Sequence, residues 1–259
     1  MKKLNLFGKN ILEDLIIVAE IGINHEGDIN KSYEIVKSLE NSGISAVKFQ
    51  SYNVDNYVAK GNKKRREMLK KFNISIDDLY NLKKEANNIG IALFSTPLTQ
   101  DMVKPLSEFC DVIKIASGDI NFFPTISNAI KTDLPVIVST GAAEIHEIDK
   151  TVEFFLNAYG KEIISQKLIL MHCVSEYPAE LKNCNLKSIN YMRERYNLHV
   201  GWSNHVIGLS ACYGAIALGA NLIEIHITDE KNNRDFRDHH LSFETNEIKG
   251  VVENLINFK

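Results

Sequence analysis

The stretch LIEIHIT at residues 222–228 is a short apolar run that carries a glutamate and a histidine on alternate positions. Seven other short apolar runs precede it, and each run is followed by a longer amphipathic stretch. They are IIVAEIG (16–22), AVKFQS (46–51), ALFSTP (92–97), VIKIASG (112–118), VIVSTG (136–141), LILMHC (168–173) and HVGWSNH (199–205). Eight alternating repeats of this kind predict an α/β fold, a (β/α)8 TIM barrel with parallel strands.

The length of the chain fits one such barrel. Its 259 residues are close to the roughly 250 that are typical of the fold, and no linker interrupts the alternation. We therefore predict a single domain over residues 1–259. Between the runs, the patterns predict helices over 30–41, 75–88, 144–159, 209–218 and 247–258, mostly ended by glycine.

Composition excludes several classes of protein. The net charge is -3 and no basic arm is present, which argues against a nucleic-acid partner. The densest basic run, KKRR at 63–66, is interpreted as a solvated face or as a loop that meets a phosphorylated ligand. No stretch of about 18 apolar residues exists, which argues against a membrane segment, and we expect a cytoplasmic protein. The four cysteines lack CxxC spacing, so we expect them reduced and mostly buried.

The polar side chains of the eight runs gather toward their C-terminal ends, which meet at one face of a barrel. Lys48 and Gln50 point the same way along their strand, as do Glu224, His226 and Thr228. Facing the outer helices, such charges would be buried without water, so we expect them in the barrel mouth. The simpler alternative is that they pair with one another at strand ends. The shared pocket would hold Glu20, Lys48, Gln50, Lys114, Ser117, Ser139, His172, Ser203, His205 and His226.

Two lysines and three serines in this set predict a site for an anion. Lys48 and Lys114 offer cationic donors, while serines at 117, 139 and 203 offer hydroxyl groups. The Ser117-Gly118 and Thr140-Gly141 turns would let the backbone approach a phosphate or carboxylate closely. Either lysine could instead form a Schiff base or a structural ion pair.

His205 and His226 end consecutive strands, so their imidazoles could converge on one divalent ion. Carboxylates such as Glu20 or Asp238, with water, would complete its coordination shell. Spacing alone leaves the ligand role and the core role equally open for this pair. We interpret His172 as structural, whereas His239 and His240 could be ligand contacts or surface residues.

The motifs that carry these residues resemble, in the same order, those of the sialic acid synthase family. They are AEIGINHEGD (19–28), VKFQ (47–50), FSTP (94–97), IKIASGD (113–119), VSTG (138–141), HCVSEYP (172–178), GWSNHVIG (201–208), ALGANLIEIH (217–226) and DHHLS (238–242). The resemblance spans nearly the whole chain, and this many ordered motifs is far more specific than any one of them.

The resemblance implies a metal-dependent condensation of phosphoenolpyruvate with the aldehyde form of an amino sugar such as N-acetylmannosamine. The products would be a nonulosonic 3-deoxy sugar acid and phosphate, as in the biosynthesis of cell-surface carbohydrate. The implied contacts to phosphoenolpyruvate are Lys48, Lys114, Ser117, Ser139 and Ser203, and those to the sugar are Gln50, Asp119, Tyr177 and Asp238. His205 and His226 would bind Mn²⁺ or Mg²⁺, and Glu20 would orient or activate water, which makes these three the implied catalytic residues.

The chain departs from the family pattern at several positions. Asn204 stands where the family has an acid beside the first metal histidine, and Ile225 replaces a lysine before the second. Phe236 and Arg237 replace glycine and proline, and Asp119 is one methylene shorter than the usual glutamate. We therefore expect a different acceptor. The small C-terminal antifreeze-like domain of the family is missing, so we expect a single-domain branch, for which a homodimer is a weaker expectation.

Two other functions stay open at this point. One is a Schiff-base aldolase that uses Lys114 or Lys48. The other is a non-catalytic relative that binds a sugar or acts as a scaffold, which the altered metal surroundings would favour. The presence of both lysines, both histidines and all three serines favours the synthase, because a binding protein does not need the whole set.

Overall fold

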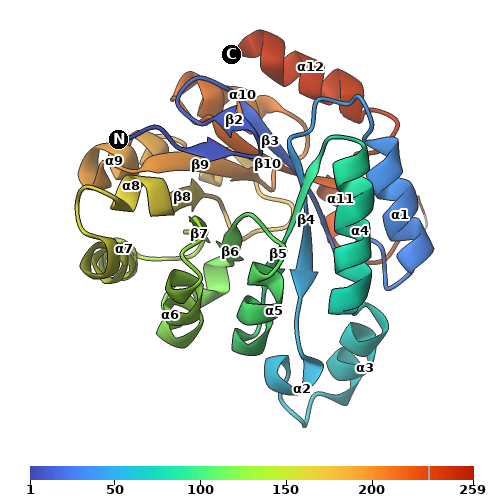
Figure 1. The fold of residues 1–259 in the computed structure, drawn as a ribbon. Helices are drawn as coiled ribbons and strands as arrows, with labels where there is room; N and C mark the ends of the chain where they lie inside the picture. Colours follow the sequence, from blue (N-terminus) through green and yellow to red (C-terminus); the bar gives the residue numbers. More distant parts are fainter. Residues whose placement is uncertain (233) are drawn as a thin grey trace.

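A computed structural model describes residues 1–232 and 234–259, and it shows parallel strands surrounded by helices (Figure 1). The barrel strands are β3 (Ile16–Gly22), β4 (Ala46–Ser51), β5 (Ala92–Pro97), β6 (Ile113–Ile115), β7 (Val136–Ser139), β8 (Leu168–His172), β9 (His199–Asn204) and β10 (Leu222–Thr228). Each predicted run forms one strand. The predicted TIM barrel is confirmed.

Hydrogen-bonded ladders join these strands in the order β5-β4-β3-β10-β9-β8-β7-β6. Strands β5 and β6 lie side by side, but no ladder joins them in the described part of the chain. Strand β6 has only three residues, fewer than the predicted run 112–118, because the chain turns after Ala116 into the 3-10 helix η2 (Ser117–Asp119). The barrel is therefore nearly closed, with one seam between β5 and β6.

Helices fill the segments between the strands, and a further short strand, β11 (Phe243–Glu244), pairs with β10. The longer helices are α1 (Ile29–Ser38), α3 (Lys63–Lys71), α4 (Ile76–Asn88), α6 (Phe123–Lys131), α7 (Ile145–Tyr159), α9 (Ser188–Tyr196), α10 (Ser210–Ala217) and α12 (Ile248–Phe258). The shorter ones are α2 (Val54–Tyr57), α5 (Val103–Ser107), α8 (Ile164–Lys167), α11 (Asp238–Leu241), η1 (Gln100–Met102) and η3 (Leu181–Asn183).

The helix ends follow local sequence signals. Ser75 caps α4 by accepting a hydrogen bond from the backbone of Asp78, and Glu144 and Glu147 form a capping box at α7. Helix α1 ends at Ser38, earlier than predicted, since the chain turns before Asn41, which has a φ of 56°. The helices predicted over 75–88, 144–159, 209–218 and 247–258 are present, with ends that shift by one residue at most.

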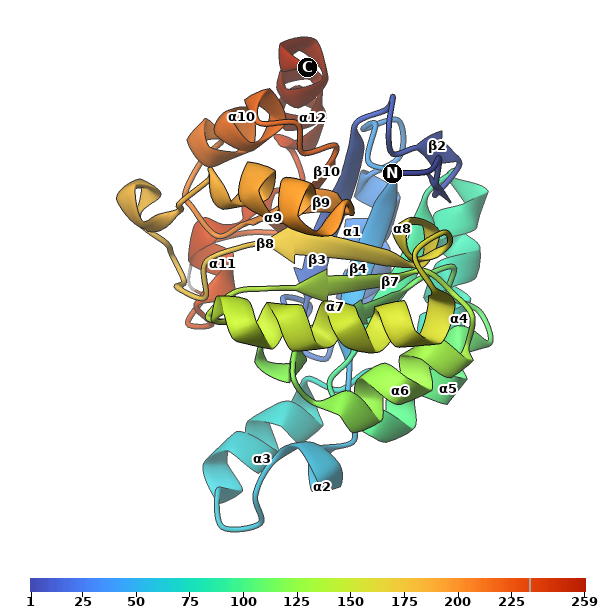
Figure 2. The same cartoon turned by 90° about the vertical axis from the view of Figure 1, so that its left-hand side faces the viewer.

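Two segments lie outside the regular alternation of barrel strands and helices. A hairpin of β1 (Asn5–Leu6) and β2 (Lys9–Asn10) precedes the first barrel strand, and Phe7 at its turn stacks on Phe94 with ring centroids 5.3 Å apart. Helices α2 and α3 form an insertion after β4 that projects from the body of the barrel (Figure 2). The insertion stands beside the C-terminal ends of the strands, where it can line a site.

The strands have apolar cores with polar side chains at their C-terminal ends. Buried Ile, Val and Leu side chains fill most strand positions, whereas Glu20, Lys48, Lys114, Ser203 and Glu224 are buried polar residues near the strand ends. All four cysteines are buried and free, as predicted. None of the described helices is long and apolar enough to cross a membrane.

The loop after β3 depends on a glycine. Gly27 has a φ of +83°, and a Cβ at this position would overlap the backbone carbonyl of Lys71 at the end of α3. We expect Gly27→Ala to lower the free energy of unfolding by more than about 2 kcal/mol, since neither backbone can yield cheaply. Urea denaturation measures this. Gly61→Ala is the control, because a Cβ there meets nothing within 4 Å, and an equal loss in both variants would contradict the explanation.

Candidate active site

One cavity of about 280 Å³ opens at the C-terminal ends of the barrel strands. It is lined by ten of the predicted site residues: Glu20, Lys48, Gln50, Lys114, Ser117, Ser139, Tyr177, Ser203, His205 and His226. His172, which was also expected in the shared pocket, does not line the cavity, so that expectation was wrong. Residues from seven strands or the loops after them thus converge on one space. Thr96, Cys173, Ser175, Glu224 and Arg237 also line the cavity, and the sequence analysis assigned none of them to a ligand.

Asp119 and Asp238 lie beside this cavity, in neighbouring hollows. Asp119 ends η2 and lines an open hollow of about 700 Å³ that shares only Leu98 with the cavity. Asp238 begins α11 and lines a third hollow, which shares Gln50, Tyr177 and Arg237 with the cavity. Burial raises the pKa of both carboxyl groups, that of Asp238 to about 6. The resemblance gave both residues as contacts to the sugar, and that role stays a prediction.

Glu224 is the centre of the cavity floor. Its Oε2 atom lies 2.7 Å from Lys48 Nζ and 3.4 Å from Lys114 Nζ, and its Oε1 atom accepts a 2.8 Å hydrogen bond from Ser203 Oγ. The two lysines therefore share one carboxylate. The structural ion pair that the sequence left open as an alternative is present. Parity along β10 places Glu224 on the same side as His226. That signal could have identified Glu224 as a partner of the two lysines.

The charges of this cluster fix its protonation. Burial would raise the pKa of Glu224, but the ammonium groups of Lys114 and Lys48 hold it well below its usual range. Burial would lower the pKa of Lys48, but Glu20 and Glu224 raise it above its usual value. Burial lowers the pKa of Lys114. For Glu20, burial outweighs Lys48 and raises the pKa to about 7, so this carboxyl group can exchange a proton near neutral pH.

A crowded turn borders the cavity on the side of β6, β7 and β8. The backbone N–H of Gly141 donates a 3.1 Å hydrogen bond to Ser117 Oγ. A Cβ at Gly141 would lie 2.6 Å from Ser175 Oγ, 2.8 Å from Cys173 Sγ and 2.9 Å from Ser117 Oγ. Glycine is therefore required here for space. The close backbone approach that the sequence predicted at the Thr140-Gly141 turn is present.

The imidazole rings of His205 and His226 face each other across the cavity. Their centroids are 5.3 Å apart at an interplanar angle of 72°, and the Tyr177 ring lies 4.1 Å from that of His205. His205 Nδ1 contacts the carbonyl oxygen of Val174, so it carries the hydrogen and leaves the Nε2 lone pair available. Burial lowers the pKa of His205 to about 4, and burial together with His205 holds the pKa of His226 well below its usual value. Both rings are neutral, the form that binds metal.

The donor atoms fit a partly hydrated divalent ion. Glu20 Oε2 is buried and has no hydrogen-bond partner, and it belongs to the same cavity as the two imidazoles. Within residues 1–232 and 234–259, no three His, Cys, Asp or Glu side chains form a metal cage on their own. Two nitrogen donors with water or ligand oxygen suit an open site better than a structural zinc.

The side chain of Asn204, the residue before His205, is turned away from the cavity. Its amide group donates to the carbonyl oxygens of Val206 and Gly208 and accepts from Trp202 Nε1. The side chain is therefore held in the wall of the barrel, and Asn204 does not line the cavity.

The remaining histidines lie elsewhere. His172 bonds through Nε2 to the carbonyl oxygen of Cys184 at 2.7 Å, which agrees with the structural role predicted for it. His239 is fully buried and bonds to Thr228 Oγ1 at 2.7 Å, so it is neither a surface residue nor a contact in the cavity. His240 is exposed.

Sequence comparison places the chain among known proteins. A sequence model of the NeuB family matches residues 35–259. The chain belongs to the NeuB family. An uncharacterized protein of Methanocaldococcus jannaschii is 38% identical over 244 residues, which cover 94% of this chain and 70% of that protein. N,N'-diacetyllegionaminic acid synthase of Legionella pneumophila is 33% identical over 92% of this chain and 70% of its own length. The named relatives are synthases, and the chain shares their enzyme class.

Solved structures agree with this assignment. N-acetylneuraminic acid synthetase from Leptospira borgpetersenii, solved in complex with citrate, superposes with a TM-score of 0.91. It is 28% identical, and the match covers 99% of this chain and 88% of that chain. A truncated 3-deoxy-D-arabino-heptulosonate 7-phosphate synthase from Thermotoga maritima, at 18% identity and a TM-score of 0.76, shares the fold.

The central carboxylate of this NeuB-family barrel should carry much of its stability. Glu224→Gln leaves two buried lysines without their shared charge partner, which we expect to lower the free energy of unfolding by about 3–5 kcal/mol. Urea denaturation monitored by circular dichroism measures the loss. Glu253→Gln, an exposed residue on α12, is the matched control. A Glu224→Gln variant as stable as this control would show that the ion cluster does not support the fold.

Proposed function

We propose that this NeuB-family enzyme condenses phosphoenolpyruvate with the open-chain form of an amino sugar, giving a nonulosonic acid and inorganic phosphate. One observation carries the proposal: the imidazole pair of His205 and His226 shares a single cavity with the Lys48–Glu224–Lys114 cluster. The first arrangement suits a carbonyl acceptor and the second an anionic donor. The names of the relatives, synthases of legionaminic, pseudaminic and N-acetylneuraminic acids, support it.

In this proposal, phosphoenolpyruvate binds over the lysine cluster. Its carboxylate and phosphate would receive hydrogen bonds from Lys48, Lys114 and the hydroxyls of Ser117, Ser139 and Ser203. Glu224 already holds both ammonium groups in place, so little rearrangement is needed when the anion arrives. Gly141 lets Ser117 and Ser175 pack closely beside the turn, which would hold the Ser117 hydroxyl in place for the phosphate.

His205 and His226 would hold Mn²⁺ or Mg²⁺, with Glu20 and water as further ligands or contacts. When bound, the ion would act as a Lewis acid that withdraws electrons from the acceptor carbonyl. Val174 keeps the His205 ring oriented through the Nδ1 hydrogen bond. Gln50 Nε2 donates a 3.2 Å hydrogen bond to Glu20 Oε1, which fixes the carboxyl group at the same end of the cavity.

The chemical step joins carbon 3 of phosphoenolpyruvate to the carbonyl carbon of the sugar, and the carbonyl oxygen becomes a hydroxyl group. Water adds at carbon 2, and its oxygen stays with the sugar acid when phosphate leaves. Glu20, with a pKa near 7, suits the transfer of a proton from that water. Tyr177, stacked on His205, would pack against the sugar chain.

A Schiff-base aldolase is the second candidate. Burial lowers the pKa of Lys114, a property that Schiff-base lysines require. However, Lys114 shares Glu224 with Lys48, and this ion pair favours the protonated amine, which is not a nucleophile. Incubation with pyruvate and borohydride should therefore leave the mass of the protein unchanged.

The imidazole pair gives a direct test of the synthase. With Mn²⁺, phosphoenolpyruvate and a panel of N-acetylated hexosamines and aldoses, we expect phosphate release that chelation with EDTA abolishes. His226→Ala should reduce the rate at least about 100-fold, since one of two protein donors is lost. His146→Ala removes an exposed histidine of α7 and serves as the control. If no sugar releases phosphate above the His226→Ala background, the protein is a binding relative.

Gly141 provides a test that is specific for the donor. The methyl group of Gly141→Ala would compete with the hydroxyls of Ser117 and Ser175 for space, so we expect KM for phosphoenolpyruvate to rise about tenfold or more, with a smaller effect on KM for the sugar. Gly250→Ala on α12, where a Cβ meets nothing within 4 Å, is the control. Equal changes in both KM values would place the donor elsewhere in the cavity.

A further inference from the structure

The hollow next to the histidines extends the cavity toward the α2–α3 insertion. It has a volume of about 380 Å³ and shares Gln50, Leu98, Tyr177 and Arg237 with the cavity. Its other walls come from Ile23, Tyr52, Tyr57, Arg65, Met68, Leu69, Phe236 and Asp238. A ligand whose reacting end lies at the imidazoles would therefore extend its other end into a space walled by aromatic rings and two arginines.

The two arginines present their guanidinium groups to this space. Arg237 lies 4.4 Å above the Tyr177 ring, and Arg65 lies 5.6 Å from the centroid of the Tyr57 ring. Stacking on an aromatic face fixes the plane of a guanidinium group but leaves its N–H edge free for an anion. Both arginines counter the rise in the pKa of Tyr57 that burial produces, so their charges act on the same small region.

These charges are only partly neutralised by the protein. Arg237 Nε lies 3.4 Å from Asp238 Oδ1, and the Arg237 side chain is 65% exposed to solvent. Arg65 forms no ion pair within the described residues, whereas the adjacent Arg66 pairs with Asp55 and donates to the carbonyl oxygens of Val54 and Val58. The basic run at 63–66 thus divides by role: Arg66 holds the insertion together, and Arg65 faces the hollow.

Tyr177 sets the distance between the two ends of the ligand. Its ring is 4.1 Å from the His205 ring and 4.4 Å from the Arg237 guanidinium carbon. One tyrosine therefore separates the carbonyl end from the cationic end, a span that the carbon chain of a hexose can cover. A negative group on the last carbon of the sugar would meet Arg237 and Arg65.

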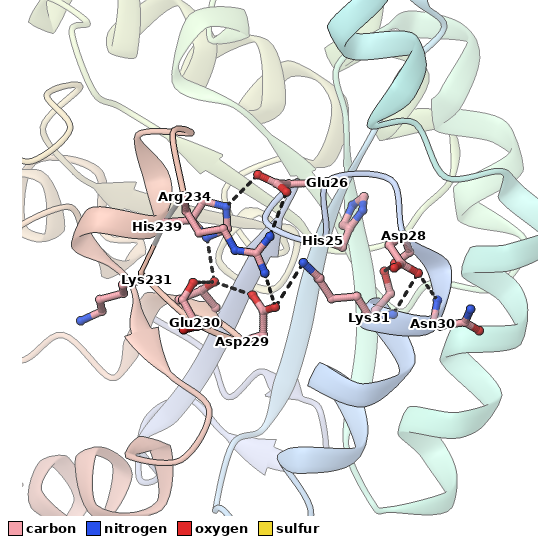
Figure 3. Close-up of polar contacts among 12 residues, drawn as sticks. His25, Glu26, Asp28, Asn30, Lys31, Asp229, Glu230, Lys231, Arg234 and His239 are labelled. Atoms are coloured by element: carbon pink, nitrogen blue, oxygen red, sulfur yellow. Dashed lines mark hydrogen bonds and ion pairs between the residues drawn. The ribbon is translucent and has the colours of Figure 1, made fainter.

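The loop that carries Arg237 is held firmly on both sides. Figure 3 shows Arg234 between Glu26 and Asp229, and Lys31 reaching the same Asp229. The N–O distances are 3.1 Å from Arg234 to Glu26, 2.6 Å from Arg234 to Asp229 and 3.2 Å from Lys31 to Asp229. Buried His239, on the other side of Arg237, bonds to Thr228. These contacts tie the segment after β10 to the loop after β3, so Arg237 is presented from an anchored support.

We infer that Arg65 and Arg237 bind a phosphate group on the acceptor, so that the sugar substrate of this enzyme is a hexosamine 6-phosphate. The inference rests on the proposed function and extends it to the class of acceptor. Two guanidinium groups offer the paired, planar donors that suit a phosphate dianion better than a neutral hydroxymethyl group. The apolar rings of Tyr57 and Phe236 close the rest of the hollow.

The test compares matched sugars. Phosphate release from phosphoenolpyruvate with Mn²⁺ is measured with N-acetylmannosamine, N-acetylglucosamine and the 6-phosphate of each, after subtracting a control without phosphoenolpyruvate. We expect kcat/KM to favour a 6-phosphate by at least about tenfold over its neutral sugar, the effect of one charge-assisted hydrogen bond. Arg65→Gln and Arg237→Gln should each reduce this preference about tenfold, whereas Lys64→Gln, an exposed neighbour on α3, should keep it.

Other outcomes overturn the inference separately from the proposed function. Equal use of a sugar and its 6-phosphate, or a preference unchanged in both arginine variants, would show that the hollow does not bind phosphate. Better turnover of glucuronate than of any 6-phosphate would assign the arginines to a carboxylate. If no sugar reacts, the synthase proposal fails, and calorimetric titration with N-acetylmannosamine 6-phosphate decides the binding: wild-type affinity must exceed that of Arg237→Gln. Thermal melts establish that each variant is folded.

Discussion

The carboxylate of Glu224, shared by Lys48 and Lys114, is the interaction on which the rest of the site depends. Lys48, Lys114 and Glu224 come from β4, β6 and β10, no two of which are neighbours in the ladder order. The cluster therefore ties strands together across the barrel axis. Buried charges are tolerated only when they are paired, so the same contacts that position the lysines in the cavity also permit the fold to contain them.

Much of this arrangement could be predicted from the sequence because the C-terminal ends of all eight strands of a barrel meet at the same face. The end of each apolar run specifies a rim residue, and parity specifies its direction, which placed Lys48, Ser203 and His226 correctly in one cavity. The rule failed for His172, which ends β8 but does not line the cavity, and it does not cover Asp119 and Asp238, which follow strands in η2 and α11. The directions of these two side chains depend on contacts within loops, which the two-residue alternation along a strand does not predict. Glu224 points into the cavity as the rule predicts, but the sequence analysis did not identify it as the ion-pair partner of the two lysines.

The departures of this chain from the family pattern do not all border the cavity. Asn204 is turned into the barrel wall by bonds to Val206, Gly208 and Trp202, whereas Arg237 borders the cavity. Under the proposed function, substitution at Arg237 would change which sugar is accepted without disturbing the lysine cluster or the imidazole pair. Membership of the NeuB family therefore indicates the type of reaction, and the acceptor has to be argued from the rim residues of this chain.

The unladdered seam between β5 and β6 has a consequence for how such an enzyme can diversify. No backbone hydrogen bonds join the two strands in the described residues, and the open hollow with Thr99, Gln100 and Asp119 lies directly above this junction. Insertions or bulkier side chains there can spread the two strands apart without breaking a ladder. The width of the barrel mouth can therefore change at this seam, while on the opposite side a ladder keeps β9 and β10, the strands nearest His205 and His226, in register.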